Sequence, residues 1–385
     1  MNILIYHPLT LERKKQDTSM DDIIYNSGYS GTETAVFEIS KHLINFGHKV
    51  TIIGPTYNVK NIEGLIILPA NDIIINSISI DEYDLFSPLF YTWDQNVHKI
   101  IRKIMINKKT TIWLWFHCFI DIEVIQELKN AGLKVFCQYL NSYCKNLYNH
   151  NGLHNDNCIV GNGINEIFTG PLERSELKKG RWIFHSTYSR GGEMCKRIFE
   201  RMKKENPEHV KELHYASYYT KDNDKLESYN NYNKDGITWH GSLSKIELRA
   251  WLDKSDYFVY MLINEKGKMH MDTYACCVLE AMARGVIVIS WNNGSLKEIY
   301  GDKIILLEPP HTDDNRLIED GIININLLNN SEYDRKVIDK ILEIDSNPKY
   351  KEELRIRAYE WAQKQLWKTR AKELERELIK VLINE

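Results

Sequence analysis

The segment from Lys268 to Asp302 constrains the fold of this chain more than any other stretch. It predicts a loop, a helix, a buried strand, a turn and a second helix that starts near Ser295. Gly285 follows the first helical pattern, and glycine ends helices readily because it has no Cβ atom. The run Val286–Ile289 is wholly apolar and β-branched, which is typical of a buried parallel strand. The first helix has its apolar face at Ala275, Val278, Leu279 and Met282, close to the i, i+3, i+4, i+7 spacing of a helix that packs on a sheet.

Two carboxylates stand out in this segment. Asp272 precedes the first helix and Glu280 lies inside it. Burying Glu280 on a helix face would be costly unless the carboxylate had a partner. Helical periodicity alone therefore favours a Glu280 that faces water, since glutamate is mostly exposed in helices.

Length and composition indicate a globular protein with two domains. A chain of 385 residues, 43% apolar and 27% charged, can form two α/β domains with good cores. The net charge of −3, with mixed signs, gives no footprint for nucleic acid. No apolar stretch approaches a membrane span and the N-terminus does not resemble a signal peptide, so a cytoplasmic protein is expected. The seven cysteines include no C-x-x-C pair, which favours reduced thiols.

The first part of the chain predicts a β-α-β unit. An apolar run at Asn2–His7 precedes a long polar loop at Leu9–Ser30 and a helical pattern at Thr34–Phe46, and a further apolar run follows. Gly31 and Thr32 lie just before the helix, where backbone N–H groups and the helix dipole favour phosphate. The loop lacks G-x-G-x-x-G, so a dinucleotide site is weakly indicated.

Histidines mark two further places in the first half. His117 closes the strand pattern Ile112–Phe116, and the carboxyl end of a parallel strand faces the ligand crevice of an open sheet. A lone histidine there is also commonly a structural hydrogen-bonding group. His150 and His154 have i, i+4 spacing, but Gly152 and several asparagines favour a loop between Tyr143 and Asn157 over a metal site.

The second half repeats the alternation of strands and helices. We expect the domain boundary near Ile167 and a strand at Arg181–Ser186. Arg190 lies in the turn before a helix that ends at Glu205, so its guanidinium and the helix N-terminus can act on one anion. Ser244 and Glu247 have the spacing of a capping box.

The block Glu280–Gly285, preceded by Asp272, resembles the E-x7-E region of the retaining glycosyltransferases of family 4, which have the GT-B fold. Their usual text is E-x-F-G, an apolar run, then E-A-M-A-x-G-x-P-V-V. Here Asp272 replaces the first glutamate, Tyr274 and Ala275 replace Phe-Gly, and Ile287 stands at the usual proline. The resemblance spans nearly the whole chain, with further matches at Gly47–Val50, Cys158–Asn165, Arg190 and Ile237–Gly241.

The resemblance implies an α/β GT-B architecture of two Rossmann-like domains facing across a cleft. Residues 1–167 would form the acceptor side and residues 168–366 the nucleotide-sugar side. Residues 367–385 would form a helix that crosses back to the N-terminal domain.

The resemblance also implies the activity, a retaining transfer of a hexose from a nucleotide sugar to a glycan or glycoprotein hydroxyl, with the donor in the cleft. GDP-mannose is the first donor we expect and UDP-glucose the next. In this family retention is ascribed to front-face attack, in which the departing phosphate oxygen takes the acceptor proton and no protein nucleophile is needed. No metal or other cofactor is expected, and Asp313-Asp314 lacks the spacer of a D-x-D motif.

The family's functional residues map onto positions of this chain. Catalytic roles fall to His117, Arg190 and Asp272, with Arg190 and the amides of residues 273–275 on the diphosphate and Glu280 on the ribose. The full set of donor contacts implied is Gly31, Thr32, Ser186, Arg190, His240, Gly241, Asp272, Thr273, Tyr274, Ala275 and Glu280.

Other interpretations of the sequence stay open. An epimerase or hydrolase of nucleotide sugars on the same fold is one, and a degenerate protein that binds glycan or nucleotide without turnover is another. A glycosidase with paired carboxylates fits less well. The expected partners are a nucleotide sugar and an acceptor, not nucleic acid. A homodimer is one option for the oligomeric state, which is open. The abundance of Asn, Ile, Lys and Tyr is also typical of enzymes of large DNA viruses, which would place the protein in host cytoplasm.

Overall fold

The computed structural model describes residues 1–7, 19–26, 31–54, 56, 58–89, 95–117, 122–148, 157–172, 179–217, 235–263, 268–269, 272–308, 318–319, 322–324 and 331–383. The chain divides into two compact units. Unit 1 comprises Met1–Ser27, Thr32–Gly163 and Leu366–Glu385, and unit 2 comprises Gly28–Gly31 and Ile164–Gln365. The division after Gly163 lies a few residues before the boundary expected near Ile167.

Unit 1 is built on an eight-stranded sheet with the order β3-β4-β2-β1-β5-β6-β7-β8. Its neighbouring strands are parallel except for β3 and β4, which pair antiparallel. The strand order reverses direction at β1 and β5, as in a Rossmann fold. The strands are β1 Asn2–Tyr6, β2 Lys49–Gly54, β3 Lys60–Ile62, β4 Leu65–Pro69, β5 Leu85–Pro88, β6 Thr111–Trp115, β7 Val135–Tyr139 and β8 Asn157–Ile159.

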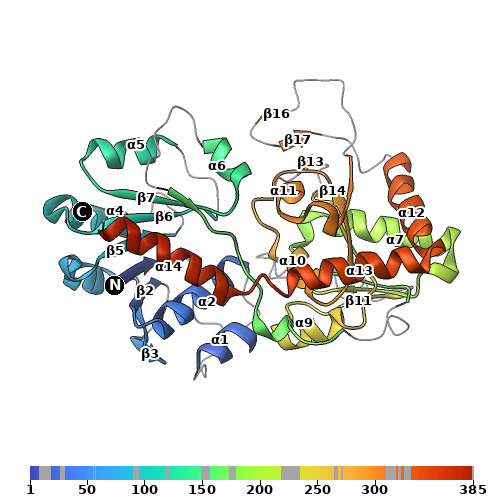
Figure 1. Ribbon diagram of the computed structural model, residues 1–385, viewed down its shortest axis with the longest axis horizontal. Coiled ribbons are helices and arrows are strands. Elements are labelled where there is room, and N and C mark those ends of the chain that lie inside the picture. The colour runs from blue at the N-terminus through green and yellow to red at the C-terminus, as the bar shows by residue number, and fades with distance from the viewer. Residues whose placement is uncertain are drawn as a thin grey trace. The chain divides into compact units, whose positions relative to one another are not determined.

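The helices of unit 1 include the last helix of the chain. His48 Nε2 lies 2.8 Å from Glu375 Oε1, and Lys134 Nζ donates to the carbonyl of Val381 at 2.6 Å. Figure 1 shows this helix, α14, in red alongside the blue and cyan elements of unit 1. The predicted return of the C-terminal helix to the N-terminal domain is thus confirmed. The helices are α1 Met20–Asn26, α2 Gly31–Asn45, α3 Asp72–Ser77, α4 Gln95–Asn107, α5 Ile122–Asn130, α6 Ser142–Tyr148 and α14 Trp367–Ile383.

Two segments that were expected to be loops contain short helices. Helix α1 interrupts the predicted loop at Leu9–Ser30, because Ser19 Oγ accepts the backbone N–H of Asp22 and the helix buries its apolar side chains. Helix α6 covers the start of the predicted loop after Tyr143, where the side chain of Asn141 accepts the N–H of Cys144. The candidate metal ligands His150 and His154, and Asp313-Asp314, lie outside the described residues.

Unit 2 contains a six-stranded, all-parallel sheet with the order β11-β10-β9-β12-β14-β15. Numbered within the unit, this is the Rossmann order 3-2-1-4-5-6, whose switch point lies between β9 and β12. The prediction of two Rossmann-like α/β domains is confirmed. The strands are β9 Arg181–Phe184, β10 Glu212–Tyr215, β11 Ile237–Trp239, β12 Tyr257–Tyr260, β14 Ile287–Trp291 and β15 Ile305–Leu307, and a small sheet is formed by β13 Lys268–Met269, β16 Ile318–Glu319 and β17 Ile322–Asn324.

The helices of unit 2 begin and end largely where sequence signals place them. Ser244 and Glu247 form the predicted capping box, and Gly285 ends α10 with a φ of +64°, a value that favours glycine. None of the described helices of the chain has the length and apolar content needed to span a bilayer. The helices are α7 Gly192–Glu205, α9 Lys245–Leu252, α10 Cys276–Ala283, α11 Leu296–Tyr300, α12 Ser331–Ser346 and α13 Pro348–Ala362.

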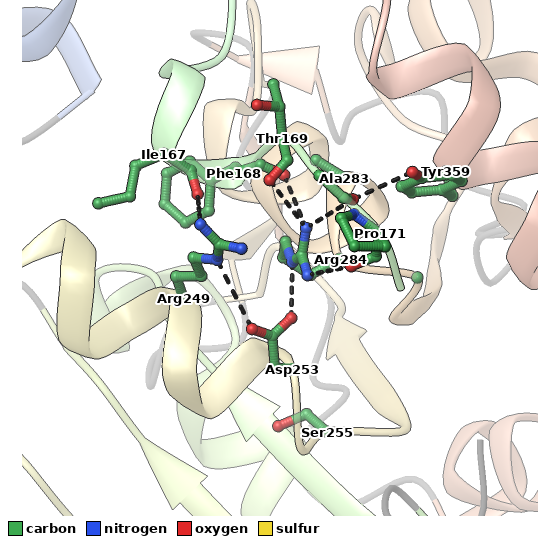
Figure 2. Close-up of polar contacts among 12 residues, drawn as sticks. Ile167, Phe168, Thr169, Pro171, Arg249, Asp253, Ser255, Ala283, Arg284 and Tyr359 are labelled. Carbon is green, nitrogen blue, oxygen red and sulfur yellow. Dashed lines mark hydrogen bonds and ion pairs between the residues drawn. The ribbon is translucent and has the colours of Figure 1, made fainter. Parts of the chain in front are cut away.

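Arg284, at the end of α10, fixes the segment through which the chain enters unit 2. Its side chain is 1% exposed, and Nε donates to Asp253 Oδ1 at 2.6 Å. Figure 2 shows the guanidinium directed at the backbone of the entry segment. The accepting carbonyls belong to Phe168, Thr169, Gly170 and Pro171, at 2.9–3.3 Å. Arg284, a residue of the motif, therefore donates hydrogen bonds to one carboxylate and four backbone carbonyls of unit 2.

Replacing Arg284 by methionine should destabilise unit 2. The change removes the closest cation of Asp253 and the donor to four carbonyls of the entry segment, so the free energy of unfolding should fall by about 3 kcal/mol. Urea titration followed by hydrogen exchange of the β12 and β14 amides reports this unit separately. Arg201→Met is the matched control, since Arg201 forms an exposed i, i+4 pair with Glu205 and should change stability by at most about 0.5 kcal/mol. Equal effects of the two variants would contradict the assignment.

Candidate functional site

The switch point of unit 2 brings three segments together at the carboxyl edge of the sheet. The turn Tyr188–Arg190 follows β9, Tyr260 ends β12, and Asp272 precedes α10. In open α/β sheets this edge is where ligands bind, because strand ends, loops and helix N-termini meet there. The chemistry of the site therefore depends on the side chains that these segments place in contact.

Asp272 is the centre of that contact. Its side chain is 3% exposed. Oδ2 accepts from Arg190 Nη1 at 3.2 Å and from the Tyr260 hydroxyl at 2.7 Å, while Oδ1 accepts the N–H of Tyr274 at 2.9 Å. Its backbone carbonyl accepts the Ser295 hydroxyl at 2.9 Å. Asp272 thus connects the turn after β9, the end of β12, the start of α10 and the start of α11.

Arg190 is the exposed partner of this cluster. Its side chain is 48% exposed although its Nη1 is bound to the buried Asp272. Gly191 follows with a φ of +110°, and a Cβ there would lie 3.0 Å from the backbone nitrogen of Leu262. The close approach and the φ both require glycine, which brings Arg190 next to the N-terminus of α7. A held guanidinium beside a helix N-terminus is suited to an anion.

The loop amides that the sequence assigned to the diphosphate are partly engaged within the protein. The N–H of Tyr274 is donated to Asp272, and the carbonyl of Ala275 accepts the Tyr300 hydroxyl at 2.7 Å. The carbonyl of Thr273 accepts the Ser295 hydroxyl at 2.9 Å. These contacts fix the conformation of the loop before α10.

Glu280 does not face water, so the expectation from helical periodicity is wrong. The residue is 3% exposed, and its Oε1 lies 2.5 Å from the Nζ of Lys245, which is 2% exposed. The buried ammonium supplies the partner that a buried carboxylate needs. Lys245 is the first residue of α9, directly after the capping serine.

His185 and Ser186 follow β9 and are both buried. His185 donates from Nε2 to the carbonyl of Cys277 at 2.8 Å. Burial lowers the pKa of His185 from 6.5 to about 3, so the ring is neutral at physiological pH. Nε2 also lies 4.0 Å from Glu280 Oε2, which places this histidine beside the buried ion pair.

His240 lies after β11 in a separate cluster. Its Nε2 is 3.0 Å from Nδ1 of His214, and both rings pack against Trp251 in tilted orientations with centroid distances of 4.5 and 4.2 Å. Burial lowers the pKa of both histidines. The next residue, Gly241, has a φ of +70°.

The remaining candidates lie in unit 1, except for Gly31, which is the last residue of a short segment assigned to unit 2. His117 follows β6, packs 4.4 Å from the Trp115 ring and has its pKa lowered to about 3 by burial and by His7. It is therefore a neutral hydrogen-bonding group near pH 7. Gly31 and Thr32 form the first turn of α2.

The structure thus joins Arg190, Asp272 and Tyr274 by direct contacts and gives Glu280 a partner that the sequence did not reveal. The sequence analysis did not single out Tyr260 or Lys245, because one lies at the end of an ordinary strand pattern and the other at the start of an ordinary helix. Their contacts with Asp272 and Glu280 are seen only in the structure. Within the described part of the chain, no group of three or more His, Cys, Asp or Glu side chains is arranged to hold a metal.

Comparison with known proteins agrees with this architecture. Residues 183–322 match the family model of "Glycosyl transferases group 1". No curated protein sequence matches the chain.

Three solved structures are similar in fold. Sucrose-phosphate synthase from Thermosynechococcus elongatus has a TM-score of 0.70 and 12% identity over 100% of both chains. HepE of Anabaena, in complex with UDP-glucose, has a TM-score of 0.65 and 11% identity over 99% of this chain and 100% of that one. WaaG, a glycosyltransferase involved in lipopolysaccharide biosynthesis, has a TM-score of 0.60 and 8% identity over 97% and 98%. The chain has the GT-B fold, and together these findings support a GT-B glycosyltransferase.

The pH dependence of stability tests the neutral state of His185. An unfolded histidine has a pKa near 6.5, whereas that of His185 is about 3 in the fold, so the unfolded chain binds the proton more readily between these values. This contribution to stability is present above pH 6.5 and is lost as the pH falls, by up to about 1.4 kcal/mol per unit. In His185→Gln the unfolding free energy of unit 2 should vary less between pH 7 and 5 than in the wild type. Urea titration with hydrogen exchange measures this free energy at each pH. His117→Gln, in unit 1, is the control, and an unchanged slope in His185→Gln would refute the assignment.

Proposed function

We propose that the protein is a retaining glycosyltransferase that transfers a hexose from a nucleotide sugar to a hydroxyl of a glycan or glycoprotein, without a metal ion. The observation that supports this most is Arg190, half-exposed at the switch point and held by the buried Asp272. An arginine fixed at that place in a Rossmann-type unit is suited to a diphosphate.

The chemistry needs positive charge at the leaving group. When the bond between the sugar and the diphosphate breaks, negative charge develops on the phosphate oxygen. Arg190 and the adjacent N-terminus of α7 stabilise that charge because they are fixed before the reaction. In front-face retention the same phosphate oxygen accepts the proton of the attacking hydroxyl, so no protein nucleophile is required.

Asp272 contributes through Arg190 in this proposal. The carboxylate is one methylene shorter than the glutamate usual in the resembling family, and its oxygens are bound to Arg190, Tyr260 and Tyr274. A short, buried carboxylate of this kind orients the guanidinium. Glu280 remains our candidate for the ribose hydroxyls, and His117 our candidate for a neutral contact with the sugar.

Two donors are proposed for direct comparison. The resemblance puts GDP-mannose first and UDP-glucose next, and the similar structure of HepE contains UDP-glucose. The acceptor is assigned to unit 1, where the resemblance places it.

Calorimetric titration with each nucleotide sugar tests the proposal. The ligands are GDP-mannose, UDP-glucose, UDP-N-acetylglucosamine and GDP, each with EDTA present. We expect micromolar binding of one sugar nucleotide, because a fixed cation and a helix N-terminus require no metal. Absence of binding by every ligand would contradict the proposed function, and binding without transfer or hydrolysis would favour a protein that binds without turnover.

Arg190→Ala tests the role of the cation. The variant should lose transfer and weaken diphosphate binding about 10–100-fold, because a hydrogen bond to a charged group contributes about 1.5–3 kcal/mol. Arg201→Ala removes an exposed arginine from the same unit and is the control. Transfer by Arg190→Ala at the rate of the control would exclude Arg190 from the site.

A further inference from the structure

Three buried side chains of unit 2 form a second polar cluster, in which Lys245 and His185 join the motif residue Glu280. Lys245 starts α9, Glu280 lies within α10, and His185 follows β9. Their exposed fractions are 2%, 3% and 0%. The Lys245 ammonium is 2.5 Å from Glu280 Oε1, and His185 Nε2 is 4.0 Å from Glu280 Oε2. The cluster therefore combines one anion, one cation and one neutral ring away from water.

Lys245 determines the charge and the orientation of Glu280. Burial favours the neutral form of a carboxyl group, whereas an ammonium in contact favours the ionised form. The contact engages Oε1, which leaves the second oxygen, Oε2, with no hydrogen-bond partner among the described residues. Buried polar atoms nearly always have a hydrogen-bond partner, so a buried carboxylate oxygen without a donor indicates a functional role.

His185 presents a second unused acceptor nearby. Its Nε2 hydrogen is donated to the carbonyl of Cys277, so in the neutral ring the lone pair is on Nδ1. Nδ1 is also buried and has no hydrogen-bond partner in the described part of the chain. Two neighbouring acceptors without donors are complementary to hydroxyl groups, which donate, and not to phosphate oxygens, which accept.

We propose that Lys245 is a positioning residue that holds Glu280 ionised and oriented, so that Glu280 Oε2 and His185 Nδ1 together accept the vicinal hydroxyls of the nucleotide's ribose. This inference rests on the proposed function and adds Lys245 and His185 to it. Both acceptor atoms are enclosed by protein atoms, so the hydroxyls reach them after a local rearrangement of side chains. Arg190 binds the diphosphate independently, at the other cluster of the unit.

Deoxy nucleotides test this arrangement without an acceptor substrate. Calorimetry compares UDP with 2′-deoxy-UDP and 3′-deoxy-UDP, and GDP with its deoxy counterparts. For the nucleotide that binds, the wild type should prefer the ribose form over one or both deoxy forms about 10–100-fold, as expected for a hydrogen bond to a charged group. In Lys245→Met the preference should fall below about 3-fold, because Glu280 loses the contact that orients its carboxylate.

Two further lysine variants separate positioning from general structure. Lys245→Arg keeps the ion pair and should retain most of the preference. Lys340→Met removes the exposed pair with Glu343, at the same 2.5 Å, and should leave the preference unchanged. A purely structural Lys245 would lower the unfolding temperature without changing the ratio of affinities, so a wild-type ratio in folded Lys245→Met would overturn the proposal.

Glu280→Gln provides a second measurement if Lys245→Met does not fold. It preserves the size of the side chain and removes the charge, so the preference should fall about 10-fold. An unchanged preference in Glu280→Gln would also overturn the proposal. If the wild type binds UDP or GDP but does not distinguish the deoxy forms, this inference fails and the proposed function stands. If it binds neither nucleotide, the proposed function itself fails.

Discussion

The buried carboxylate of Asp272 is the interaction on which the candidate site depends. It receives hydrogen bonds from a turn, a strand end and a loop that are up to 84 residues from one another in the chain, at Arg190, Tyr260 and Tyr274. A buried carboxylate needs such donors, because an unpaired charge in the interior is strongly unfavourable. The same contacts that satisfy the charge also fix the position of Arg190. The hydrogen bonds that stabilise the buried charge of Asp272 are therefore the same ones that hold Arg190 in place.

Arg190 and Lys245, the two cations that we assign to the nucleotide site, differ in exposure and therefore in use. Arg190 is half-exposed, so part of its guanidinium can meet an anion from solution. Lys245 is enclosed with Glu280, where an ion pair contributes little net stability and leaving one partner alone is costly. We therefore explain the pair by a role in orienting the Glu280 carboxylate and not by a contribution to stability. On our account the exposed cation binds the diphosphate, and the enclosed one determines the state of a carboxylate.

Local patterns in the sequence predicted the elements that position the site. Apolar periodicity predicted α10 and β14, the spacing of Ser244 and Glu247 predicted the cap of α9, and the glycine at 285 predicted the end of α10. These features depend on neighbours within a few residues. The pairing of Glu280 with Lys245 and of Arg284 with the entry segment joins positions 35 and more than 110 residues apart. Such partners meet only in the folded chain, which periodicity does not encode, and so periodicity alone wrongly favoured a Glu280 that faces water.

A crystal structure of the protein with UDP and with GDP would show directly whether Arg190 binds the diphosphate. We expect diphosphate oxygens within hydrogen-bond distance, about 2.7–3.2 Å, of the Arg190 guanidinium. We also expect that the contact between Arg190 and Asp272 remains and that the nucleotide lies at the carboxyl edge of β9 and β12. A nucleotide bound elsewhere in unit 2, with Arg190 still directed to solvent, would show that Arg190 does not bind the diphosphate.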